Sequence, residues 1–134
     1  MERRTIFLIG GSDDETALIT EEPASDLCAL VCQYRGRSIR AEATDFFEAF
    51  CLIRLDLEKD KLIPFCYGAS LNVYPSGMAR DMAQGLSAYR MTTGKHVSGL
   101  DIVEIFDSGP DVIPATVETQ REFFQDWLAS DKSR

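Results

Sequence analysis

The strongest constraint on the fold is an almost continuous apolar run that ends in a two-residue turn. Residues 27–34 are apolar at nearly every position, which is typical of a strand covered on both faces. Arg35-Gly36 separates this run from residues 37–42, where apolar and polar residues alternate. A two-residue connection with glycine second, between two strand-like segments, favours a tight turn. The sequence therefore predicts an N-terminal β-hairpin.

Three later segments have apolar residues at every third or fourth position, the spacing of an amphipathic helix. The first begins at Thr44 or Asp45, the second at Ser76 and the third after Thr116, and each of these residues can cap a helix. The second is predicted to continue to at least Tyr89. The apolar stripe of the first, Phe46, Phe50, Ile53 and Leu57, is expected to face the core. The apolar faces of the other two are Met78, Met82, Leu86 and Tyr89, and Phe123, Phe124, Trp127 and Leu128. For Met78, a core position and a position in a binding patch with Tyr67, Asn72 and Tyr74 both stay open.

The remaining segments complete an α+β pattern. Strands are predicted at residues 5–9, 62–68 and 100–106, and a helical turn is predicted around residues 15–19. A chain of 134 residues fits one domain with a core of its own. We therefore expect a single globular domain over residues 1–134, with one mixed sheet of about five strands and three helices packed on it. An open α/β sandwich is the alternative.

The formal net charge of −8 comes from two acidic stretches. Residues 11–34 carry six acids and no Lys or Arg, and residues 96–126 carry seven acids against Arg121. Such a surface repels nucleic acid and anionic membranes and attracts a basic protein, although acidity also serves solubility alone. The residues predicted to bind a partner are Asp13, Asp14, Glu15, Glu21, Glu22, Asp101, Glu104, Asp107 and Asp111.

The cysteines and the hydropathy pattern indicate a reduced cytoplasmic protein. Cys28, Cys32, Cys51 and Cys66 all lie in apolar segments, as buried free thiols do. No Cys-x-x-Cys pair accompanies the single histidine, His96, so neither a metal site nor a cofactor is predicted. No apolar run reaches the roughly 18 residues that a membrane span needs.

The loop at residues 70–77 is the main candidate for a ligand site. Gly68, Asn72, Pro75 and Gly77 constrain the backbone around it, and its candidate ligand or loop-building residues are Asn72, Tyr74, Ser76 and Arg80. The loop contains neither a phosphate-binding nor a dinucleotide-binding glycine pattern, and no nucleophile elbow surrounds its serines. No catalytic residue is therefore assigned.

Residues 72–82 read Asn-Val-Tyr-Pro-Ser-Gly-Met-Ala-Arg-Asp-Met. This block, the small size, the acidic balance and the α+β pattern together resemble small bacterial immunity proteins of contact-dependent or polymorphic toxin systems. The resemblance implies a non-catalytic inhibitor that binds a cognate, often basic, toxin domain, and it assigns no role to single residues. Two alternatives stay open: a small enzyme or ligand-binding domain with its pocket at residues 70–77, and a homodimeric regulatory protein using the Met and Tyr face of the second helix.

Overall fold

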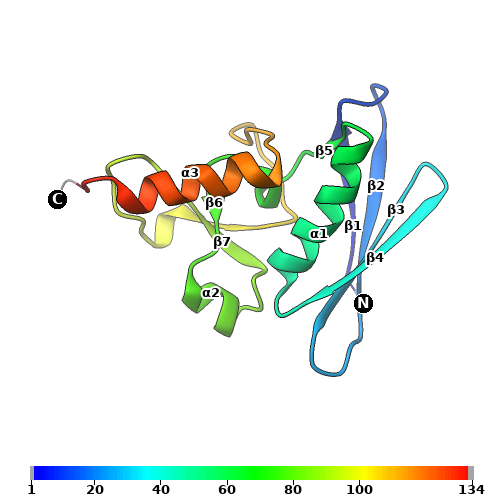
Figure 1. The fold of residues 1–134 in the computed structure, drawn as a ribbon, viewed down its shortest axis with the longest axis horizontal. Coiled ribbons are helices and arrows are strands. Elements are labelled where there is room, and N and C mark those ends of the chain that lie inside the picture. Colours follow the sequence, from blue (N-terminus) through cyan, green and yellow to red (C-terminus); the bar gives the residue numbers. More distant parts are fainter. Residues whose placement is uncertain (1, 133–134) are drawn as a thin grey trace.

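The computed structural model describes residues 2–132, and its α+β class confirms the prediction. Within these residues, eight strands form two sheets, and three α-helices pack around them. The first sheet packs against the first helix, and the second sheet and the other two helices form the rest of the molecule (Figure 1). Every pairing between the named strands is antiparallel, so the expected single mixed sheet is replaced by two antiparallel ones.

The first sheet is an antiparallel meander with one extra strand. Its members are β1 (Arg3–Ile9), β2 (Thr16–Glu22), β3 (Cys28–Tyr34), β4 (Arg37–Ala43) and the short β5 (Ile63–Pro64), in the spatial order β4-β3-β2-β1-β5. The predicted hairpin is confirmed, since Tyr34 pairs with Arg37 across the turn. Arg35 and Gly36 have φ of 51° and 71°, which is the backbone of the tight turn that matches strand twist.

The predicted helical turn at residues 15–19 is wrong, because residues 16–19 belong to β2 and Glu15 directly precedes it. Ala17 and Ile19 are buried and alternate with partly exposed residues, so the segment has the two-residue period of a half-buried strand. The neighbouring acids obscured that short alternation in the sequence.

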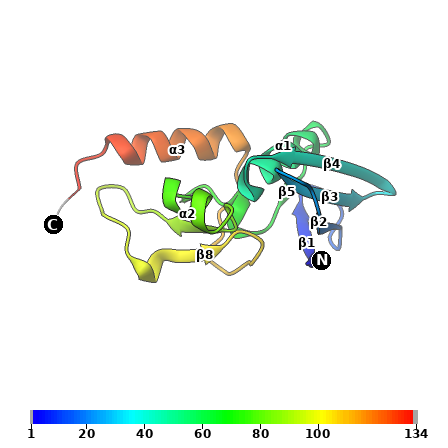
Figure 2. The same ribbon diagram turned by 90° about the horizontal axis from the view of Figure 1, so that it is seen from below.

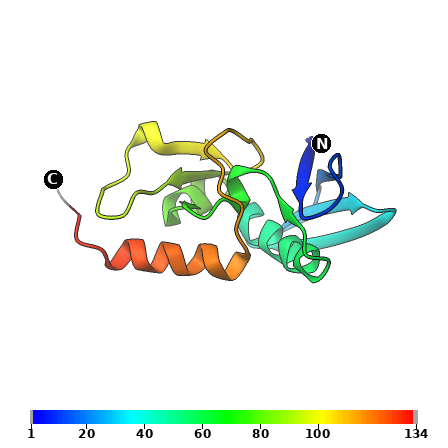
Figure 3. The same ribbon diagram turned by 90° about the horizontal axis from the view of Figure 1, so that it is seen from above.

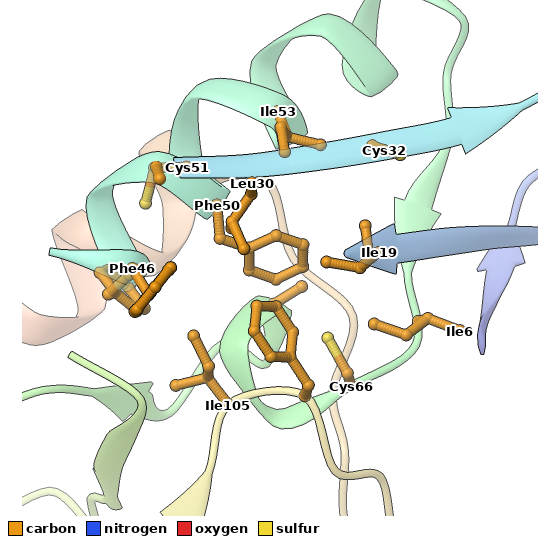
Figure 4. Close-up of a cluster of buried hydrophobic side chains, with 14 of the residues drawn as sticks. Ile6, Ile19, Leu30, Cys32, Phe46, Phe50, Cys51, Ile53, Cys66 and Ile105 are labelled. Carbon is orange, nitrogen blue, oxygen red and sulfur yellow. The ribbon is translucent and has the colours of Figure 1, made fainter. Parts of the chain in front are cut away.

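Helix α1 (Phe46–Lys59) covers one face of the first sheet, mainly over β3 and β4. It begins where predicted, since the Asp45 side chain accepts a hydrogen bond of 2.8 Å from the Glu48 amide. Phe50 and Ile53 point from the helix toward Ile19 and Leu30 of the sheet (Figure 4). This apolar layer is the main core of the protein.

The second sheet consists of β6 (Val73–Tyr74), β7 (Ser87–Arg90) and β8 (Ile102–Glu104), in that order. Helix α3 (Val117–Ala129) covers one face of it, as Figure 3 shows, and has the predicted bounds and the predicted cap at Thr116. The Tyr74 and Phe124 rings stack with centroids 4.2 Å apart. Two short 3-10 helices, η1 (Tyr67–Ala69) and η2 (Gly99–Asp101), lead into this layer.

The strands predicted at residues 62–68 and 100–106 are shorter in the structure. The first contributes only β5 before the chain turns into η1, and this turn carries it from the first sheet to the second. Pro64 lacks an amide proton and is found at the edge of the first sheet, where proline is tolerated. The second is reduced to β8, which η2 precedes.

The prediction of a long second helix is also wrong, although its predicted cap at Ser76 is confirmed. Helix α2 (Gly77–Met82) has six residues, and the chain then passes through Gln84 and Gly85 with φ of 54° and 73°. A Cβ on Gly85 would lie 3.0 Å from the Phe47 amide nitrogen, so α1 and this turn approach too closely for a side chain. Residues 87–90 then form a strand instead of helix.

A buried polar network joins the two layers of the protein. Arg54 of α1 is 1% exposed, and its Nη1 donates to Gln120 Oε1 of α3 at 2.6 Å. Arg54 also donates to the carbonyls of Gly68 and Ala115, both at 3.0 Å. The Gln120 amide donates in turn to the carbonyls of Gly68, Ser70 and Val73 at 2.9 to 3.0 Å. The network therefore fixes α3 against α1 and the intervening loop.

Candidate protein-binding surface

An apolar groove of about 240 Å³ lies between α2 and the second sheet. Met78, Ala79, Met82 and Ala83 form the wall on the side of α2, while Ala88, Tyr89 and Ile102 come from β7 and β8. Figure 2 shows α2 and β8 within the second layer. Because almost all of its lining side chains are apolar, the groove suits an apolar side chain of another molecule.

Helix α2 is held in place by Arg80, which ties it to α1. The Arg80 Nη1 lies 2.9 Å from Asp45 and 3.1 Å from Glu48, and the guanidinium lies 5.3 Å from the Phe47 ring centroid. Three charged and aromatic contacts, together with the Ser76 cap, fix a helix that is too short to be stable alone. The helix therefore presents a fixed surface.

The methionines of α2 are directed to solvent. Met78 and Met82 are one helical turn apart and are 70% and 80% exposed. Ile102 lines the groove, and Leu100, two residues before it, is 89% exposed. Clustered exposed apolar side chains mark interaction sites, and Met adapts its shape to different partners.

An acidic cleft of about 230 Å³ lies next to the groove. Glu2, Glu21, Glu104 and Asp107 line it with Arg4 as its cation, and Arg4 pairs with Asp107. Burial, and then the neighbouring charge of Glu2, raise the pKa of the Glu21 carboxyl. Ser87 lines the groove and donates a hydrogen bond of 3.0 Å to Glu104, so groove and cleft are adjacent. A partner's cation would relieve the repulsion among these carboxylates.

The nine acids predicted to bind a partner are distributed over several environments. Three of them, Glu21, Glu104 and Asp107, meet in the acidic cleft. Asp13 and Asp14 are exposed between β1 and β2. The other four lie in contacts within the chain: Glu15 with Arg35, Glu22 with Arg40, Asp101 with the Ser98 amide, and Asp111 with Tyr67 and Arg90.

These internal contacts lower the proton affinity of two of the acids. The hydrogen bond from Arg35 lowers the pKa of Glu15, and the hydrogen bonds from Tyr67 and Arg90 lower the pKa of Asp111. Both carboxylates have a cationic partner, as Asp107 of the acidic cleft has in Arg4, whereas no Lys or Arg of the described residues forms an ion pair with Glu21 or Glu104.

The four candidates of the 70–77 loop are used to build the fold. Asn72 donates to the Met91 carbonyl, Tyr74 is buried against Phe124, Ser76 caps α2, and Arg80 pairs with α1. The hollow beside Tyr74 and Ser76 measures only about 50 Å³ and is lined by aromatic and apolar side chains. The structure therefore does not gather these four residues around a ligand-sized cavity.

The four cysteines have the surroundings of core residues. All four cysteines are free and buried, and burial raises the pKa of Cys32 and Cys66 to about 12 and that of Cys51 to about 11. These thiols stay protonated at neutral pH, whereas a nucleophilic cysteine needs a lowered pKa. Between residues 2 and 132 no three His, Cys, Asp or Glu side chains group as a metal ion would require. In the same range no helix is long and apolar enough to cross a membrane.

The sequence interpretation left open whether Met78 lies in the core or in a binding patch, and it extended the second helix to Tyr89, so it did not predict the groove. Two residues carried the missing signal: Gly85, which ends the helical pattern, and Tyr89, which fits a strand as well as a helix. A six-residue helix covers little of the core, so its apolar side chains remain outside. No protein-family model matches this chain, and no curated protein matches it either.

Proposed function

We propose that this chain is a non-catalytic protein-binding module, and specifically an immunity-type inhibitor that neutralises a basic toxin domain in the bacterial cytoplasm. The observation that carries the proposal is the exposed methionine groove beside the acidic cleft. An apolar centre with a polar rim is the usual composition of a specific protein interface.

The two parts of the surface have different roles in this proposal. Met78, Met82 and Ile102 bury an apolar side chain of the toxin, which provides affinity. Glu21, Glu104 and Asp107 attract its Lys or Arg side chains, which provides association rate and specificity. Inhibition follows by occlusion, because the bound chain covers the toxin surface and takes no part in chemistry.

The net charge of −8 supports a basic partner and predicts salt dependence. Exposed charges are screened over about 10 Å at 0.1 M salt and about 3 Å at 1 M. The affinity for the toxin is therefore expected to fall at least about tenfold between about 0.05 M and 0.5 M NaCl. An affinity independent of salt would contradict the electrostatic part of the proposal.

Co-expression with the toxin tests the proposal directly. An immunity gene directly follows the gene of its toxin, so the toxin domain encoded immediately upstream is expressed with and without this chain. The chain is expected to restore growth, and Met82→Glu is expected to abolish the rescue because it places a charge in the groove. Absence of an upstream toxin gene, or equal growth with and without the chain, would contradict the proposal.

The exposed methionines also favour a second candidate, a homodimeric regulatory protein that pairs through the same groove. Sedimentation of the purified chain and of Met82→Glu distinguishes the two candidates. A dimer that Met82→Glu dissociates would favour the regulatory protein, whereas a dimer that it leaves intact would not involve this groove.

A further inference from the structure

The strand β4 forms one edge of the first sheet, and half of its backbone groups lack a partner there. Leu8 donates to the Glu15 carbonyl at 2.9 Å, which fixes the alternation of hydrogen bonds across the antiparallel strands. In this register the amides and carbonyls of Ser38, Arg40 and Glu42 point away from β3. None of the described residues bonds to them. An edge of this kind is a template for another strand.

The helix above this edge also has an unpartnered apolar stripe. Leu52 and Leu55 of α1 lie one turn apart and are 45% and 46% exposed. Helix α1 contacts β4 and β3 more than the other strands, so it lies toward the β4 side of the sheet (Figure 1). A molecule that extends the sheet beyond β4 therefore lies beside this helix as well.

The charges on β4 favour a second copy of this chain at the strand edge, paired in one register. On the exposed face of β4, Arg40 and Glu42 have opposite charges and are two residues apart, and within one chain the Arg40 guanidinium pairs with both Glu42 and Glu22. If two copies of β4 pair antiparallel with Ala41 opposite Ala41, each Arg40 lies opposite Glu42 of the second copy. A shift of one residue in each strand instead places Arg40 opposite Arg40, and like charges directly opposite are destabilising. The edge is thus complementary to itself.

We propose that two copies of this chain form a dimer by antiparallel pairing of β4, with Arg40 opposite Glu42 of the second copy and the two α1 helices side by side. The dimer then has one continuous sheet, and the exposed Leu52 and Leu55 side chains of both copies lie on the same side of it. The groove beside α2 belongs to the other layer of the protein and stays accessible, so the dimer does not depend on the proposed toxin binding.

Charge reversal with rescue tests this pairing. Sedimentation equilibrium is measured for the wild type, Arg40→Glu, Glu42→Arg and the double exchange. Each single change turns two attractive cross-strand pairs into repulsive ones and is expected to raise the dimer dissociation constant at least about tenfold. The double exchange restores opposite charges across the interface and is expected to restore the dimer. Circular dichroism verifies that each variant is folded.

Two further variants separate this interface from others. Leu52→Lys is expected to weaken the dimer to a similar degree, while Met82→Glu, in the groove, is expected to leave it unchanged. A chain that stays monomeric up to about 1 mM, where even weak complexes form, would overturn the proposal and assign Arg40 and Glu42 to the protection of the edge. A dimer insensitive to both single charge reversals would overturn it as well.

Discussion

Replacing Gln120 by Leu tests the buried network that joins the two layers. The Gln120 side chain is fully buried, and its oxygen accepts a hydrogen bond from the Arg54 guanidinium. The variant keeps the approximate size of the side chain but leaves a buried cation with one acceptor fewer. Burial already lowers the pKa of Arg54, and its Nε has no hydrogen-bond partner among residues 2–132. The loss of a bond to a charged group costs about 1.5 to 3 kcal/mol.

The backbone carbonyls that accept hydrogen bonds from the Gln120 amide add to this loss of stability. The Gly68 carbonyl keeps its bond from Arg54, and the Ser70 carbonyl keeps one from the Val73 amide at 3.2 Å. Val73 O points away from β7, because the adjacent Asn72 carbonyl is the one that accepts from the Met91 amide. The Val73 carbonyl therefore loses its donor in Gln120→Leu, which lowers the free energy of unfolding by about 1 to 3 kcal/mol. Together the two losses predict that Gln120→Leu lowers the free energy of unfolding by about 4 kcal/mol.

Urea unfolding measures the effect, with the fluorescence of Trp127, the single tryptophan, as the probe. Gln125→Leu is the matched control, because Gln125 is exposed on the same helix, and its effect should stay within about 0.5 kcal/mol. Arg54→Met removes the buried charge but leaves Gln120 Oε1 and the Ala115 carbonyl without their donor, so it should cost about as much as Gln120→Leu. A double variant should be more stable than the sum of the single effects predicts. Additive effects, or a loss below about 1 kcal/mol for Gln120→Leu, would refute the reasoning.

Two further predictions concern packing and pH. Gly85→Ala should lower the free energy of unfolding by about 2 kcal/mol, because φ is 73° and the new Cβ meets the Asp45 carboxylate at 2.8 Å. Gly77→Ala, with open space around it, should be neutral or stabilising. Thermal unfolding compares the two variants, and equal effects would contradict the close approach at Gly85. The Cys66 thiol has a pKa raised by burial from 9.0 to about 12, so the folded state keeps a proton that the unfolded state loses. The stability that this protonated thiol contributes to the folded state is present below pH 9 and is lost as the pH rises from 9 to 12. Cys66→Ala should therefore reduce the alkaline slope of the unfolding free energy by about 1.4 kcal/mol per pH unit, and an unchanged slope would contradict the buried thiol.

Local signals in the sequence predicted those parts of the fold that local interactions determine. The Arg35-Gly36 turn, the Asp45 cap and the helix at residues 117–129 were all predicted correctly, since each depends on neighbours in the chain. The division into two sheets depends on where the chain crosses between layers, which is a tertiary property. No local pattern marks the crossing at residues 65–70.

The candidate surface was predicted only in part. Acidity directed attention to Glu21, Glu104 and Asp107, but the structure brings them together from β2, from β8 and from the residues after it, far apart in the chain. The methionines were placed on one face of a long helix with Leu86 and Tyr89, because four apolar residues between 78 and 89 fit a helical period. That period continues past the point where Gly85 ends the helix, and only the strand β7 shows why.

The most direct test of the proposed function is the affinity of the upstream-encoded toxin domain for three forms of this chain. Titration calorimetry compares the wild type with Met82→Glu and with Leu128→Glu, a charge added at an exposed leucine of α3 that does not line the groove. If the methionine groove binds the toxin, Met82→Glu weakens binding at least about tenfold, or about 1.4 kcal/mol, and Leu128→Glu leaves it unchanged. Equal affinity of Met82→Glu and the wild type would contradict the proposal.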